Sequence, residues 1–115
     1  METYHEKLGK TTIDPGVLTN IAKLTSLSAS GVSKMATGPH SVGSLFKKNY
    51  SDGVKIEVEN NTVYIELYLV LKSNADLLKT SRTVQQKVSR AITEMVGMEI
   101  GHVNVHIEDI DYQNE

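Results

Sequence analysis

Two histidines near the C-terminus, His102 and His106, have the most versatile side chains in this sequence. Imidazole binds metal ions and exchanges protons near neutral pH. The two residues lie four positions apart on one face of a predicted strand, which separates them by roughly 13 Å. Zinc holds its nitrogen ligands at about 2 Å, so this pair needs further ligands to hold an ion. We therefore predict no metal site and no cofactor, and expect solvated or hydrogen-bonded histidines.

Ser44 and Lys47 have the Ser-x-x-Lys spacing of some acyl-transfer enzymes. Such enzymes carry companion motifs, and the partial matches at residues 51–53 and 79–81 each contain a wrong residue. The glycines of residues 38–45 have the spacing of a P-loop, but a serine replaces the lysine that reaches the phosphates. The chain has no cysteine, which excludes a cysteine nucleophile and a thiolate zinc site. These residues favour a protein that is not an enzyme.

A polar stripe with three cations lies on the helix predicted for residues 75–96. Spacings of three or four residues keep its members on one side of the helix. The stripe consists of Lys79, Arg82, Gln86 and Arg90. The alternative prediction is therefore that the protein is a small nucleic-acid-binding or regulatory module that uses this stripe. The chain has 12 Lys and Arg against 14 Asp and Glu, a net charge of −2, so a nucleic-acid partner is not expected.

A β-hairpin is the clearest structural element. Apolar residues alternate with polar ones over residues 54–59 and 63–71, and Asn60 and Asn61 between them suit a two-residue turn. This register pairs Val58 with Val63 on one face. On the other face it pairs Lys55 with Glu66, so the apolar pattern and the charge pattern agree.

The other elements complete a two-layer sandwich. We predict strands over residues 5–12, 31–37 and 102–108, a helix that begins at Asp14, a turn or two of helix within residues 40–48, and the helix of residues 75–96. The fold class is α+β with order β-α-β-β-β-α-β, in which a mainly antiparallel sheet carries two amphipathic helices on one face. The 115 residues form a single domain, residues 1–115, whose acidic tail over about residues 109–115 is expected to fray.

The face of this sheet that the helices leave open is the candidate interaction face. It carries Tyr64, Glu66, Tyr68, His102 and His106. Tyrosine supplies the amphipathic aromatic area that protein interfaces favour. We expect this face, or an edge strand, to mediate self-association or docking to a partner.

The order and spacing of several segments resemble the alkaline shock protein family of Gram-positive bacteria, the envelope stress response proteins. The matching segments are TIDPGVL (12–18), GVKIEV (53–58), VYIELYLV (63–70), VQQKV (84–88) and HVNVHI (102–107). The segment of residues 39–50 departs from the family, which is more often rich in glycine and leucine there.

This resemblance implies a small protein with no catalytic residues that self-associates and attaches to a membrane-anchored partner in envelope homeostasis. No run approaches the ~20 apolar residues of a membrane span, and the N-terminus carries no apolar signal region. Together with these features, the resemblance implies a cytoplasmic homo-oligomer at the inner face of the membrane.

Overall fold

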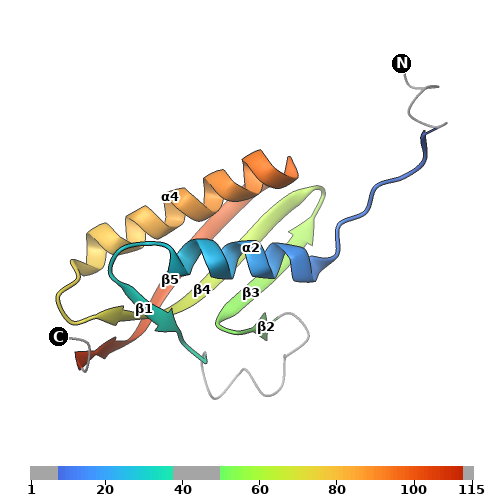
Figure 1. The fold of residues 1–115 in the computed structure, drawn as a ribbon. Helices are drawn as coiled ribbons and strands as arrows, with labels where there is room; N and C mark the ends of the chain where they lie inside the picture. Colours follow the sequence, from blue (N-terminus) through green and yellow to red (C-terminus); the bar gives the residue numbers. More distant parts are fainter. Residues whose placement is uncertain (1–7, 38–49, 113–115) are drawn as a thin grey trace.

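The structure is a computed structural model that describes residues 8–37 and 50–112 (Figure 1). The elements are, in chain order, α2 (Pro15–Leu27), β1 (Val32–Met35), β2 (Tyr50–Ser51), β3 (Val54–Glu59), β4 (Thr62–Lys72), α4 (Leu77–Val96) and β5 (Glu99–Asp111). All five strands join one sheet, and most of its pairings are antiparallel. The predicted α+β class is confirmed.

The predicted order β-α-β-β-β-α-β is wrong at its first element. Residues 9–14 form neither strand nor helix, so the order is α-β-β-β-α-β when the two-residue β2 is counted with β3. Leu8, an apolar residue of the predicted strand, is 68% exposed, and no strand of the described sheet pairs with this segment. An extended segment without a paired neighbour has no partner for its backbone N–H and C=O groups. The helical turns predicted within residues 40–48 lie outside the described residues.

Local capping signals set the starts of both helices and the end of α4. Asp14 caps α2 by accepting a hydrogen bond of 2.7 Å from the N–H of Gly16. Asp76 caps α4 by accepting a hydrogen bond of 3.0 Å from the N–H of Lys79. Gly97 ends α4 in the left-handed conformation, with φ of 79°, that favours glycine at this position.

The hairpin of β3 and β4 has the predicted register. Its Cα partners are Val54 and Leu67, Ile56 and Ile65, and Val58 and Val63 on one face, with Lys55 and Glu66, and Glu57 and Tyr64 on the other. Asn60 and Asn61 form the turn with φ of 55° and 62°. Both values lie in the left-handed region that a tight hairpin turn requires and that asparagine tolerates.

Strand β4 is the centre of the sheet. Strand β5 pairs with it in parallel from Thr62 to Lys72, so β3 and β1 share the other edge of β4. A parallel neighbour needs a crossover connection, and α4 is that connection. The register therefore places residues of β4 beside residues of β5 that are 37 to 39 positions later in the chain.

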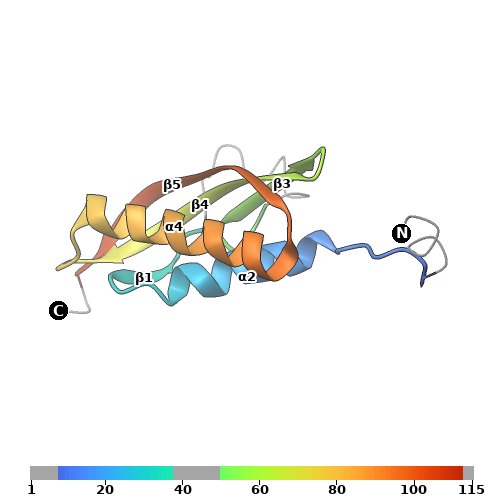
Figure 2. The same cartoon turned by 90° about the horizontal axis from the view of Figure 1, so that it is seen from above.

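Both helices cover the same face of the sheet, and the core lies between the two layers (Figures 1 and 2). The central row of α4 is fully buried and consists of Val84, Val88 and Ile92. Leu78 and Met95, near the two ends of α4, are exposed. No helix in the described part of the chain is long and apolar enough to cross a bilayer.

Strand β5 reaches further than predicted. Asp109, Ile110 and Asp111 pair with Val70, Leu71 and Lys72 of β4, so the expected fraying is wrong for residues 109–111. Ser33 on β1 also donates a hydrogen bond of 2.6 Å to the Asp111 carboxylate, which ties the strand end to a second element. Residues 113–115 lie outside the described chain.

Candidate functional site

The open face of the sheet carries one polar cluster, built from alternate residues of β4 and β5. The parallel register sets Tyr64 beside His102, Glu66 beside Asn104, and Tyr68 beside His106. We call these six residues the Glu66 cluster. All five residues of the predicted interaction face belong to it. Asn104 is the member that the sequence did not single out.

Glu66 is the centre of the cluster. Its Oε2 atom accepts hydrogen bonds from Nε2 of His102 at 3.0 Å and from Nδ2 of Asn104 at 2.9 Å, and its Oε1 atom lies 2.6 Å from Nε2 of His106. An ionised carboxylate only accepts, so both imidazoles must present their Nε2–H. One carboxylate thus joins three side chains of the neighbouring strand.

The two tyrosine rings flank these histidines. The ring of Tyr68 stacks on that of His106 with centroids 4.7 Å apart and planes 14° apart. The ring of Tyr64 meets that of His102 edge-on, with centroids 5.3 Å apart. Tyr64, Tyr68 and His106 are only partly exposed, and the exposed His102 lies against the Tyr64 ring. The cluster therefore presents side chains that their neighbours hold in place.

Gly101 creates the space for the Tyr64 ring. A Cβ atom at this position would lie 2.2 Å from Cε2 of Tyr64, well inside contact distance. Gly101 also has no partner on β4, because the register shifts by one residue between Val63 and Tyr64. Glycine in a strand often marks such a bulge or a close approach.

The pKa of Glu66 is lowered from its ordinary value of 4.5. Partial burial opposes this by raising the pKa, but the hydrogen bonds from His106 and Asn104, the attraction of His106 and the hydrogen bond from His102 outweigh it. The pKa of Tyr68 is raised by burial and by the negative charges of Glu66 and Glu108. Glu66 is therefore a carboxylate at neutral pH, held as an acceptor by its neighbours.

The chemistry of the cluster is hydrogen bonding between fixed groups. Across residues 8–37 and 50–112, no group of three or more histidine and acidic side chains is arranged to hold a metal ion. Lys55, the Cα partner of Glu66 in the hairpin, forms no ion pair with it, since the carboxylate turns to β5. Ser44 and Lys47 lie outside the described residues.

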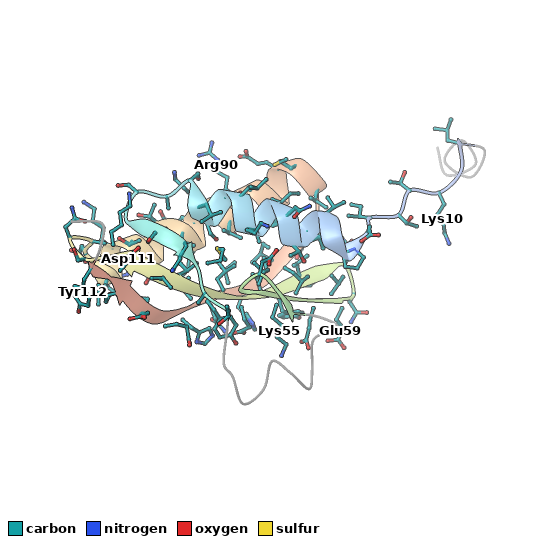
Figure 3. The ribbon with its side chains drawn as sticks, turned by 60° about the horizontal axis from the view of Figure 1, so that its bottom comes forward. Lys10, Lys55, Glu59, Arg90, Asp111 and Tyr112 are labelled. Atoms are coloured by element: carbon teal, nitrogen blue, oxygen red, sulfur yellow. The ribbon has the colours of Figure 1, made fainter. Side chains whose placement is uncertain are left out.

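The basic stripe lies in the helix layer, away from the Glu66 cluster. Figure 3 shows Arg90 on the helix side of the molecule and Lys55 on the opposite side. Arg90 forms an exposed ion pair of 3.0 Å with Glu94, one helical turn on, while Lys79 and Arg82 are exposed. This pairing lowers the positive charge that the stripe offers to a polyanion.

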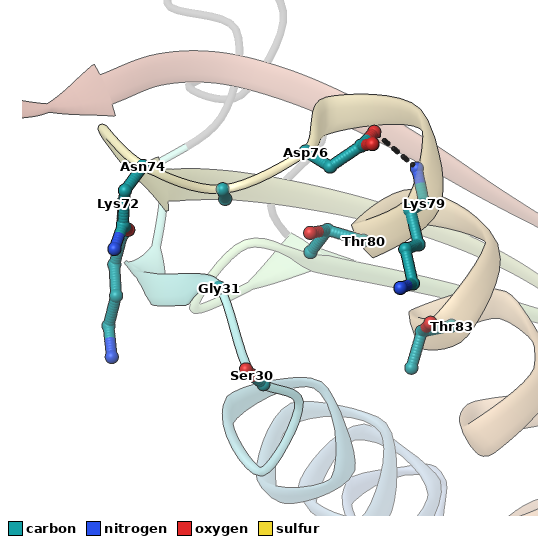
Figure 4. A pocket seen from close by; sticks show the side chains of 9 residues that line it. Ser30, Gly31, Lys72, Asn74, Asp76, Lys79, Thr80 and Thr83 are labelled. Carbon is teal, nitrogen blue, oxygen red and sulfur yellow. Dashed lines mark hydrogen bonds between the residues drawn. The ribbon is translucent and has the colours of Figure 1, made fainter.

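A shallow polar pocket lies at the N-terminus of α4 (Figure 4). Ser30, Lys72, Lys79, Thr80 and Thr83 are among the residues that line it. Asp76 also lines it, and its carboxylate caps the helix by accepting a hydrogen bond from the backbone N–H of Lys79. The pocket carries side chains of opposite charge, and no pattern in the sequence predicted it.

Most of the chain matches a known family. The sequence profile of the alkaline shock protein 23 family, described as having a cell envelope-related function, matches residues 3–112. The uncharacterized protein YqhY of Bacillus subtilis is 29% identical over 119 residues, which cover 100% of this chain and 87% of YqhY. The uncharacterized protein YloU of the same organism is 24% identical over 70 residues, which cover 61% of this chain and 58% of YloU.

Solved structures share the fold at very low identity. Two variants of the MamM CTD, one of them in a zinc form, are each 8% identical to this chain. The first has a TM-score of 0.53 and covers 84% of this chain and 95% of its own, and the zinc form has a TM-score of 0.52 and covers 85% and 88%. At this identity the likeness concerns the arrangement of helices and strands alone.

Proposed function

This chain belongs to the alkaline shock protein 23 family, and from that membership we propose a non-enzymatic interaction protein that serves the cell envelope. In this proposal the protein self-associates in the cytoplasm and docks to a membrane-anchored partner at the inner face of the membrane. The resemblance of the sequence to envelope stress response proteins and the cell envelope-related description of the family support the setting.

The observation that carries the proposal is the sheet face with its aromatic rings, which no helix or strand among the described residues covers. Both helices pack on the other face (Figure 2), and Tyr64 and Tyr68 are partly exposed on the open face, in contact with the rings of His102 and His106. Rings that are already ordered lose little conformational entropy when a partner covers them. Tyrosine also brings both apolar area and a hydroxyl to an interface. The open face therefore suits docking of a protein surface.

The bonding of Glu66 favours docking over catalysis. A general base needs a free lone pair within reach of the proton it takes. Both oxygens of Glu66 already accept hydrogen bonds from His102, Asn104 and His106, and its pKa is lowered. Such a carboxylate organises its neighbours and has little basicity to offer a substrate.

The test is the double variant Tyr64→Ala/Tyr68→Ala, compared with the wild type and with Tyr112→Ala. Tyr112 is 68% exposed and lies outside the Glu66 cluster, so it controls for loss of a surface tyrosine. The protein would be cross-linked in cells and recovered from membrane and cytosolic fractions separately.

We expect the wild type and Tyr112→Ala to recover the same integral membrane protein and the double variant to lose it. Circular dichroism would show that the double variant is folded. Equal recovery by all three proteins would contradict docking through this face. Recovery from the cytosolic fraction alone would contradict the membrane-anchored partner.

A further inference from the structure

Strand β5 has a long free edge. It runs for 13 residues and pairs with β4 along one side. No strand of the described sheet pairs with its other side. An unpaired edge presents a row of backbone N–H and C=O groups that can add a further strand.

The central part of this edge has none of the features that keep edge strands apart. Such protection comes from bulges and charged side chains. In β5 the unpaired bulge residues are Gly101 and Glu108, and the acidic residues are Glu99, Glu108, Asp109 and Asp111. Residues 102–107 lie between these features. They are regular and contain no Lys, Arg, Asp or Glu, and their six residues are a usual length for a paired strand.

We propose that this edge pairs antiparallel with β5 of a second copy of the chain, about a two-fold axis at Val105. The inference rests on the self-association in the proposed function and assigns it a surface. The two sheets become one continuous sheet whose helices all lie on the same side.

The charges of β5 favour the antiparallel direction. A parallel pair in register would set Glu108, Asp109 and Asp111 beside the same residues of the second copy, and like charges directly opposite destabilise a sheet. An antiparallel pair instead sets Glu108 of one strand opposite His102 of the other. The second copy is thus complementary to the segment between the bulges at Gly101 and Glu108, and Glu99 and Asp111, which this register sets opposite each other, lie outside that segment.

The side-chain pattern places the axis at Val105. In this register Val103 pairs with Ile107 of the second copy, and His102 lies opposite the bulge residue Glu108 of the second copy, at the end of the paired segment. Moving the axis to Asn104 would oppose His102 to His106, and moving it to His106 would oppose Val103 to Asp109. Paired residues share a face of the sheet, so the axis at Val105 joins apolar to apolar and imidazole to carboxylate.

The absence of cysteine from the sequence makes the register measurable by disulfide formation. On the proposed axis, Val105 lies opposite itself at about 4.5 to 5.5 Å between Cα atoms, within the range a disulfide spans. The two Asn104 residues of the dimer would lie diagonally across the junction, with their Cα atoms about 7 to 8 Å apart, beyond that range. Glu57, exposed on β3 and on the open face, is the control for contact between open faces.

The single variants Val105→Cys, Asn104→Cys and Glu57→Cys would be oxidised in parallel, after sedimentation and circular dichroism of each. We expect Val105→Cys to form covalent dimers fastest and Glu57→Cys to stay unlinked. Faster linking of Asn104→Cys would overturn the register, and faster linking of Glu57→Cys would overturn edge pairing while leaving self-association intact. A wild-type chain that sediments as a monomer at every concentration would instead overturn the self-association itself.

Discussion

Replacing Glu66 by glutamine removes one charge from the centre of the cluster and keeps its shape. The glutamine oxygen can still accept one or two hydrogen bonds, but its amide nitrogen donates where the carboxylate oxygen Oε1 accepted from His106. Hydrogen bonds to a charged group contribute about 1.5–3 kcal/mol and neutral ones about 1 kcal/mol. The Glu66 side chain is 22% exposed, so solvent screens this charge only in part. We expect Glu66→Gln to lower the free energy of unfolding by about 1–2 kcal/mol near neutral pH.

The loss depends on pH in a direction that follows from the lowered pKa. Because the pKa of Glu66 is lower in the folded state than its ordinary value of 4.5, the folded protein resists protonation of this group more than the unfolded chain does. The stabilisation is therefore fully present above about pH 4.5 and is lost as the pH falls through the folded pKa. In acid, the wild type should lose stability towards that of the variant.

Urea unfolding followed by circular dichroism would measure both effects, at about pH 7 and at about pH 3. Glu57→Gln, an exposed carboxylate on the same face, is the control and should change stability by less than about 0.5 kcal/mol. A deficit of Glu66→Gln that stays constant or grows towards acid pH would refute this account. So would a deficit no larger than that of the control at neutral pH.

Two further substitutions test local features of the structure. Ser26 is fully buried and its hydroxyl has no hydrogen-bond partner among residues 8–37 and 50–112, so Ser26→Ala should raise the free energy of unfolding by about 1 kcal/mol, and a loss on urea unfolding would contradict it. Gly101→Ala should displace the ring of Tyr64 from β5 and shift the NMR resonances of the His102 ring, while unchanged resonances would show that the ring does not lie over Gly101.

The hairpin was predictable because two independent patterns fix the same register. The apolar alternation and the pairing of Lys55 with Glu66 both point to a turn at Asn60 and Asn61, and the structure has that turn. The helix start at Asp14 was likewise predictable, because a cap is a local interaction. Features that depend on a few neighbouring residues can be read from the sequence.

For the Glu66 cluster, the sequence predicted the face of the sheet but not the contacts, because the contacts depend on residues far apart in the chain. The sequence places its members on the open face, but their contacts depend on which strand lies beside β4. His102 and His106 are separated along their own strand, yet both reach Glu66, because that residue lies between them on the parallel neighbour. The strand predicted over residues 5–12 failed for a related reason, since a strand needs a neighbour that local sequence does not supply.

Edge pairing and docking are coupled if both proposals hold. A two-fold axis at Val105 would bring two Glu66 clusters onto one continuous face, because His102 and His106 lie on the strand that forms the junction. A partner covering both copies would then gain affinity from two sites at once. A change at the edge of β5 that blocks pairing should therefore weaken docking even though Tyr64 and Tyr68 remain in place. Loss of the tyrosines should instead weaken docking while leaving the dimer intact.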